Sequence, residues 1–75
     1  RHAFARNLRR AAELIAVPDT RVLEIYNALR PYRSTKAELL AIADELANKY
    51  NAKVNAQLVK EAAELYEKRD RLRKD

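Results

Sequence analysis

Apolar residues are spaced as in helices along the whole chain. They recur three or four positions apart, and no stretch alternates between apolar and polar residues as a half-buried strand does. Prolines and asparagines interrupt the pattern at three places, and joints of about three to six residues force neighbouring helices to turn back on one another. We therefore predict an all-α fold, a small compact four-helix domain over residues 1–75, with helices at roughly 2–16, 20–29, 35–50 and 55–73.

One apolar stripe on each predicted helix supplies the expected core. Residues three or four positions apart share a helix face, and an apolar face has to be buried against another element. The expected stripes are Phe4, Leu8, Ala11 and Ile15; Val22, Ile25, Tyr26 and Leu29; Leu39, Ile42, Ala43, Leu46 and Tyr50; and Leu58, Ala62, Leu65 and Leu72.

Several helix ends carry local signals. Thr35 and Glu38 have the spacing of a capping box, in which each side chain accepts a hydrogen bond from the other residue's backbone N–H. Asn51 tolerates the left-handed conformation that ends many helices. The expected side-chain caps of the second and fourth helices are Asp19 or Thr20 and Asn55.

The composition excludes most kinds of catalytic and cofactor site. The chain contains no cysteine and no glycine, which rules out thiol catalysis, thiolate metal sites and glycine-rich phosphate loops. His2 is the only histidine and Ser34 the only serine, so no Ser-His triad is expected. Acid pairs such as Asp44 and Glu45 lie among lysines and arginines, as on a solvated helix surface. We predict no catalytic, cofactor-binding or metal-binding residue and therefore no enzyme activity.

The chain is basic, with a formal net charge of +5 and a pI of about 9.8. The second and third helices have the spacing of a helix-turn-helix. However, the third helix carries Asp44 and Glu45 and lacks the arginine, asparagine or glutamine set that reads base edges. No apolar run approaches the about 18 residues of a membrane span, and no tryptophan marks an interfacial helix. We predict a partner that is neither nucleic acid nor membrane.

The outer face of the third helix is a candidate protein-binding surface, here called the α3 strip. Its members lie opposite the expected core stripe and are small or weakly charged, in a chain that is 36% charged. They are Ala37, Leu40, Ala41, Asp44 and Asn48. Leu40 is the expected anchor, because hot spots are a few large side chains among residues that exclude water. An ordinary surface, or contact with another helix of the same domain, is the equally weighted alternative.

The loop before the third helix is a second candidate, which we place at the rim of the α3 strip. Tyr32 and Arg33 precede a helix N-terminus, where anions are favoured. One interpretation is a docking loop for a carboxylate or phosphate of the partner. The alternative is that Tyr32 packs across the joint while the arginines reach solvent or an acidic neighbour.

Four longer runs resemble a known family. They are RAAEL at 10–14, VPD at 17–19, LEIYNALRPYRSTK at 23–36 and ELLAIAD at 38–44. These runs resemble the small subunit of adenosylcobalamin-dependent diol and glycerol dehydratases, closely over about residues 7–46 and more loosely as far as residue 66. A run such as YNALRPYRSTK is far more specific than any short motif.

The resemblance implies a helical, non-catalytic subunit. In that family the large subunit holds the substrate and a metal ion, cobalamin sits between the large and medium subunits, and the small subunit packs against the large one. No catalytic residue can be carried over to this chain. The resemblance also implies a cytoplasmic protein if it is native, since the N-terminal extension tied to microcompartments is absent here.

Missing residue types favour a different interpretation of the chain's origin. A chain with neither methionine nor glycine is expected to be an excised and re-engineered domain, a recombinant stand-alone scaffold that binds a chosen target protein. The polar character of the last helix fits a former interface that now faces water. The alternative is a native structural fragment of a dehydratase small subunit, whose partner is the large subunit.

Overall fold

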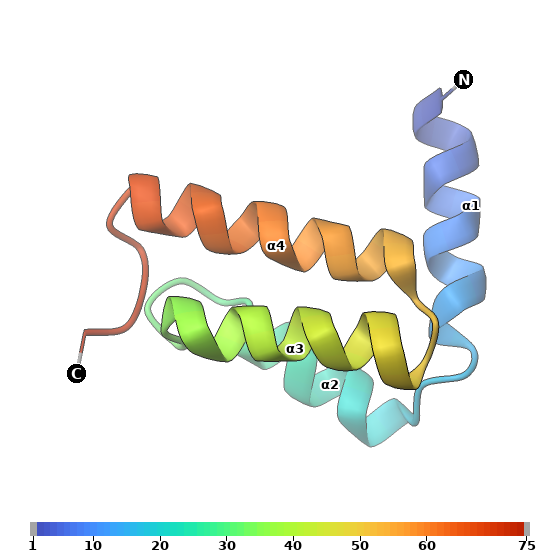
Figure 1. Ribbon diagram of the computed structural model, residues 1–75, viewed down its shortest axis with the longest axis horizontal. Coiled ribbons are helices and arrows are strands. Elements are labelled where there is room, and N and C mark those ends of the chain that lie inside the picture. Colours follow the sequence, from blue (N-terminus) through green and yellow to red (C-terminus); the bar gives the residue numbers. More distant parts are fainter. Residues whose placement is uncertain (1, 75) are drawn as a thin grey trace.

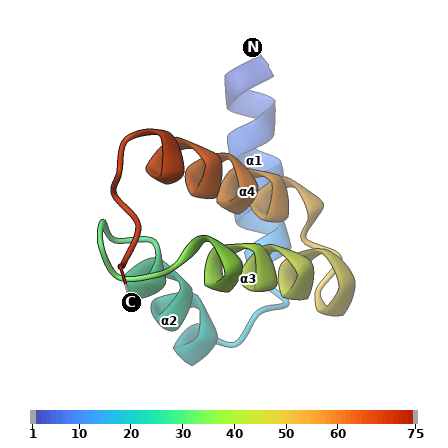
Figure 2. The ribbon, with the colours of Figure 1, turned by 60° about the vertical axis from the view of Figure 1, so that its left-hand side comes forward.

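The computed structural model describes the backbone of residues 2–74 and the side chains of residues 8–74. Its four helices are α1 (His2–Leu14), α2 (Asp19–Ala28), α3 (Lys36–Lys49) and α4 (Lys53–Lys68). In Figures 1 and 2, α3 and α4 lie side by side and antiparallel, α2 lies against α3, and α1 stands across the end of this group. The predicted all-α, four-helix fold is confirmed for the described residues.

The core forms where α3 and α4 meet. Leu39 and Leu46 of α3 are fully buried, and buried alanines on both helices leave room for the two backbones to approach each other closely. The predicted α3 core stripe is confirmed. The buried apolar residues are Val17, Ile25, Leu39, Ile42, Ala43, Leu46, Ala52, Ala56, Val59 and Ala63.

Two of the predicted helix ends are confirmed. The Thr35 hydroxyl accepts a hydrogen bond from the Glu38 N–H at 3.2 Å, and the Glu38 carboxylate accepts one from the Thr35 N–H at 2.9 Å, which completes the capping box. Asn51 has a φ of 54°, so it ends α3 in the left-handed region. The chain then turns directly into α4, with the Ala52 N–H donating to the Leu46 carbonyl at 2.7 Å.

The predicted side-chain caps of α2 and α4 are wrong. Pro18 occupies the N-cap position of α2 and supplies no side-chain hydrogen bond, although its fixed φ suits the start of a helix. Asn55 lies inside the first turn of α4 and is buried. It is not the cap because Glu13, a residue of α1, accepts the hydrogen bonds of the first N–H groups of α4.

The predicted core stripe of α4 is also wrong by about one residue. Ala56, Val59 and Ala63 face the core, whereas Leu58 is half-buried and Leu65 is exposed. Hydrophobicity alone indicated the face with the large leucines as the core face. The fit against α3 instead favours the side of α4 that carries small side chains, and the leucines lie on its flanks.

The last helix ends five residues before the predicted boundary. After Lys68 the chain reaches Asp70, whose φ is 57°, and then runs back along the loop between α2 and α3. The Tyr32 N–H donates to the Arg71 carbonyl at 2.7 Å, and the Arg73 N–H donates to the Ser34 carbonyl at 2.8 Å. These bonds replace the backbone hydrogen bonds that a longer helix would have made.

The predicted core stripe of α1 is wrong as well. Ile15 is 86% exposed, Leu8 is 58% exposed and Ala11 is exposed, while the Phe4 side chain lies outside the described residues. Helix α1 reaches the core instead through Leu14, which packs against its edge, and the chain that follows reaches it through the buried Val17. The apolar face of α1 is therefore not buried against the other helices.

We expect Leu46→Ala to destabilise the domain by about 2–5 kcal/mol, because it removes a large, fully buried side chain and leaves a larger cavity in the core. Leu46 is 1% exposed. Chemical denaturation followed by circular dichroism measures the loss. Leu40→Ala is the matched control on the same helix, where the leucine is 36% exposed and the expected cost is below about 1 kcal/mol. Equal costs for the two variants would contradict this core.

Candidate functional site

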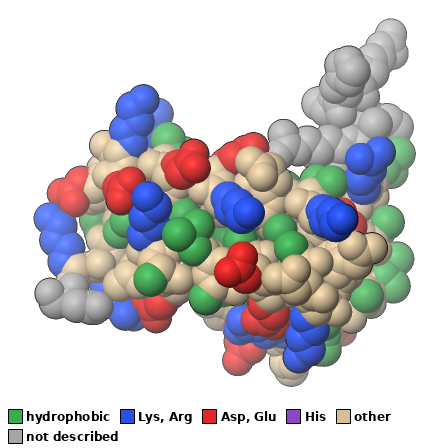
Figure 3. Space-filling model, viewed as in Figure 1, with side chains coloured by type: hydrophobic (Ala, Val, Ile, Leu, Met, Phe, Trp, Pro, Cys, Tyr) green, Lys and Arg blue, Asp and Glu red, His purple; other side chains and the backbone are tan. Residues whose placement is uncertain are grey.

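The α3 strip lies on the surface of the molecule. All five members, Ala37, Leu40, Ala41, Asp44 and Asn48, are exposed on the side of α3 opposite its buried stripe. The strip therefore does not pack against another helix of the same domain, which was one of the two alternatives. In Figure 3, lysines, arginines and acids are interspersed over α3 and α4, with hydrophobic side chains between them.

The loop with Tyr32 and Arg33 is held by the C-terminal segment, residues 69–74, which follows α4. Tyr32 adopts a φ of 68°, which is uncommon for a bulky residue, and its N–H is bonded to the Arg71 carbonyl. The Arg71 guanidinium lies over the Tyr32 ring, 5.8 Å from its centroid, as in a cation–π contact. Tyr32 thus packs across the joint, as one interpretation held, yet 55% of it stays exposed beside Arg33.

Ion pairs connect the N-terminal end of α3 to its surroundings. Glu38 pairs with Arg73 at 2.8 Å, and Lys36 pairs with Glu67 at 2.9 Å. The hydrogen bond from the Thr35 N–H, aided by Arg73, holds the pKa of Glu38 below its ordinary value. Exposed pairs of this kind contribute little stability one by one. Together they keep the loop, the C-terminal segment and the start of α3 in one arrangement.

A partly buried ion pair connects α2 to α3. The Arg21 guanidinium donates to both carboxylate oxygens of Glu45, at 3.0 Å and 2.5 Å. This two-bond geometry is specific to arginine, and it lowers the pKa of the Glu45 carboxyl. The pair fixes α2 beside α3 and adds to the packing of Val22, Ile25 and Leu29 in and against the core.

Helix α1 is attached to the first turn of α4 mainly through the carboxylate of Glu13. Glu13 accepts hydrogen bonds from the Val54 and Asn55 N–H groups, both at 3.0 Å, and from the Asn55 amide at 2.7 Å. The Asn55 amide also donates to the Arg10 carbonyl at 3.0 Å. A negative charge at the N-terminus of α4 is favourable to the helix dipole. Glu13 is thus the side-chain cap of α4, supplied from another helix.

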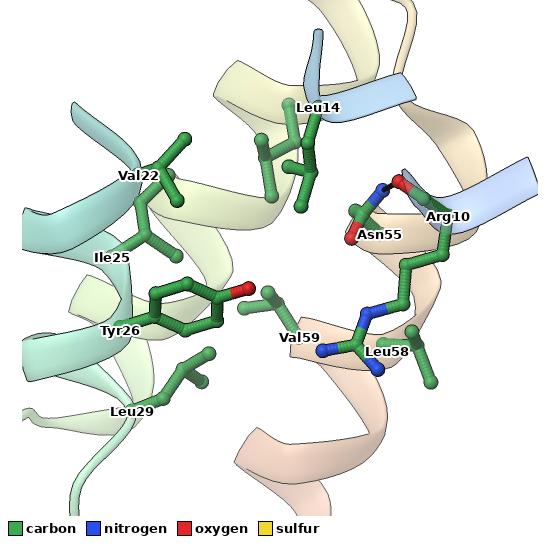
Figure 4. A pocket seen from close by; sticks show the side chains of 10 residues that line it. Arg10, Leu14, Val22, Ile25, Tyr26, Leu29, Asn55, Leu58 and Val59 are labelled. Carbon is green, nitrogen blue, oxygen red and sulfur yellow. Dashed lines mark hydrogen bonds between the residues drawn. The ribbon is translucent and has the colours of Figure 1, made fainter. Parts of the chain in front are cut away.

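An apolar groove lies between α1 and α2 and is closed at its base by α4. It consists of a cavity of about 60 Å³ and an adjoining, more open hollow of about 230 Å³; Arg10, Leu14 and Tyr26 line both. Figure 4 shows the Arg10 guanidinium and the Tyr26 hydroxyl pointing toward the space between the helices. We call these parts together the α1–α2 groove. The apolar spacing of α1 did not indicate this groove, because it predicts that the apolar face of α1 lies in the core.

The described residues offer little for catalysis. Ser34 is buried and its hydroxyl donates to the Ala28 carbonyl at 2.7 Å, which fixes the loop instead of leaving a nucleophile. Among the described side chains, those of residues 8–74, no cluster of three acidic side chains is placed to hold a metal ion. None of the described helices combines the length and apolar character of a membrane span. His2, the only histidine, has a side chain outside the described residues.

The described residues form an all-helical domain that exposes several large apolar side chains, which is the class that the fold defines. The sequence comparison is more specific. The family model for the dehydratase small subunit matches residues 1–73, so the chain belongs to the dehydratase small-subunit family.

Two curated relatives show how close the similarity is. The chain is 65% identical over all 75 residues to the propanediol dehydratase small subunit of Salmonella typhimurium, of which it covers 43%. It is 64% identical to the corresponding subunit of Citrobacter freundii, of which it covers 44%. The chain thus spans less than half the length of these relatives. Both are dehydratase small subunits, so the comparisons favour the native small subunit, and they give no support to a re-engineered scaffold.

We expect the contact between Glu13 and α4 to give stability that depends on pH. Burial, the largest single influence, raises the pKa of Glu13, but the hydrogen bonds from Val54 and Asn55 and the positive charge of nearby Arg9 together lower it below its ordinary value of 4.5. A lowered folded-state pKa means that the unfolded chain binds more protons in this range. The stabilisation is therefore complete above about pH 4.5 and is lost as the pH falls through the folded-state pKa.

Glu13→Gln tests this expectation. At pH 7 the variant should be less stable by about 1 kcal/mol, the usual size of an N-cap contribution. The stability difference from the wild type should shrink toward pH 3, as measured by urea unfolding at each pH. Glu64→Gln, an exposed acid-to-amide change on α4, is the control and should show no such trend. A difference for Glu13→Gln that is constant with pH would contradict the assignment.

Proposed function

We propose that this chain is a non-catalytic structural part of a dehydratase and acts by binding the other subunits of that enzyme. The observation that supports this most strongly is the identity of about two thirds to propanediol dehydratase small subunits over the whole chain. On this proposal the enzyme acts on propanediol or a related small diol, and the residues that carry out the dehydration belong to other subunits.

The cavities of the chain support a non-catalytic role. The adenosylcobalamin of such a dehydratase is a large corrinoid, and the α1–α2 groove does not fit it. Its cavity of about 60 Å³ and its open hollow of about 230 Å³ are each below the ~300–1,000 Å³ of most small-molecule sites. The groove walls are mainly apolar. We therefore propose that this chain does not bind cobalamin.

The α3 strip is the surface that we propose for contact with the partner subunit. Its alanines permit a close approach, Asp44 and Asn48 supply polar groups that can fix orientation, and Leu40 is the anchor. The Tyr32–Arg33 loop lies at the N-terminal end of the same helix, held by the C-terminal segment. That fixed position supports its proposed place at the rim of the contact, since an ordered loop loses little entropy on binding.

We expect the chain to co-purify with the remaining subunits of the Salmonella typhimurium propanediol dehydratase, and Leu40→Arg to reduce this binding at least about tenfold. The arginine would have to lose its hydration inside the contact, while the free domain keeps the side chain in water. Biolayer interferometry with the immobilised chain measures the affinity, and a thermal melt shows that the variant is folded.

The control is Glu64→Arg, a comparable change on the exposed side of α4. If the wild-type chain does not bind the purified subunits, the proposed function is wrong. If the wild type binds and folded Leu40→Arg binds equally well, the function stands and the contact does not include the α3 strip.

A further inference from the structure

Helix α1 is amphipathic, but its apolar side is left without a partner in this fold. Leu8, Ala11 and Ile15 lie on one face at steps of three and four residues, and all three are exposed. Side chains of this kind are normally buried against another element. Around the helix, this face continues through Ala11 into the α1–α2 groove.

The α1–α2 groove extends this apolar surface onto α2. Leu14 and Leu58 form part of its wall, and Tyr26 stands at its edge with 48% of its surface exposed. Next to Tyr26 on α2 is Leu23, which is also exposed. The apolar surface thus runs across two helices and is larger than the cavity at its centre.

The charge at the groove has one sign. Arg10 is the only charged side chain among the described residues that line it, and its guanidinium has no ion-pair or hydrogen-bond partner within the part of the chain that the structure describes. Glu13, the acidic residue three positions further along α1, already accepts hydrogen bonds from the first turn of α4. The Tyr26 hydroxyl, in the same described region, adds a second available donor. Both groups favour a carboxylate beside an apolar side chain.

We propose that the face of α1 and the α1–α2 groove together bind a helix of a dehydratase partner subunit, one that has an apolar stripe flanked by aspartate or glutamate. The proposal rests on the proposed function and adds a second contact, distinct from the α3 strip. An apolar side chain of the partner enters the cavity, and a neighbouring carboxylate pairs with Arg10. A groove between two helices suits a helix that lays its apolar face into it.

The dimensions of the site favour a protein segment over a small ligand. A cavity of about 60 Å³ is large enough for one aliphatic side chain and is well below the size of most small-molecule sites. A ligand confined to that cavity would also leave Leu8, Ile15 and Leu23 in water. A partner helix covers the cavity and these side chains at once, which is how exposed apolar patches on soluble domains are usually explained.

The test uses the binding of the chain to the remaining subunits of the Salmonella typhimurium enzyme, with variants chosen at exposed positions. Ile15→Glu and Arg10→Glu should each weaken binding at least about tenfold, which is the size of effect expected for an interface anchor. Leu65→Glu and Lys60→Glu make the same chemical changes on exposed parts of α4 and should change affinity less than about threefold. Thermal melts of all four variants verify that they fold.

The salt dependence of binding tests separately whether the partner helix supplies a carboxylate to Arg10. Raising the salt concentration should weaken wild-type binding by screening the Arg10 pair, and Arg10→Gln should bind more weakly with a smaller salt dependence. An unchanged salt dependence in Arg10→Gln would overturn the acidic character of the partner helix.

The remaining outcomes separate the two proposals. If the wild type binds and Ile15→Glu and Arg10→Glu bind like their controls, the groove proposal is wrong and the proposed function stands. If the wild type does not bind, both fail. If sedimentation shows that Ile15→Glu converts a wild-type dimer to a monomer without changing the affinity for the subunits, the occupant is a second copy of the chain and the proposal is also overturned.

Discussion

Close packing of α3 against α4 is the constraint on which the rest of the structure depends. The alanines on the facing sides of the two helices, Ala43, Ala56 and Ala63, are buried there and let Leu39 and Leu46 fill the space between the backbones. Once α4 uses this side against α3, its larger Leu58 and Leu65 lie on its flanks. Leu58 then lines the α1–α2 groove on one flank, and Leu65 is exposed on the other.

Polar contacts then help to place the parts that lie outside the α3–α4 interface. The Arg21–Glu45 pair fixes α2, backbone bonds to the Tyr32–Ser34 loop fix the C-terminal segment, and Glu13 attaches α1 to the first turn of α4. Helix α1 is held by Glu13, Asn55 and Leu14, while its apolar face is exposed in the folded chain. This exposure is what would let the proposed partner helix reach the face.

The sequence was sufficient for features that depend on local chemistry. The helix count, the capping box at Thr35 and the left-handed Asn51 follow from residue type and spacing alone, and so does the apolar stripe of α3. The stripes of α1 and α4 could not be predicted, because hydrophobicity does not say which of two possible faces fits a neighbouring helix. The exposure of the α3 strip followed from the predicted stripe of α3, whereas the groove required the position of α1, which Glu13 and Asn55 determine across more than 40 residues of sequence.

The central claim, that α1 keeps its apolar face outside the core for a partner, can be tested on the three isoleucines. With selectively labelled methyl groups, a soluble paramagnetic probe should broaden the NMR signal of Ile15, which is 86% exposed, and spare Ile25 and Ile42, which are 6% and 8% exposed. Adding the remaining dehydratase subunits should then protect Ile15 alone. An Ile15 signal already protected in the free chain, or still broadened in the complex, would contradict the account.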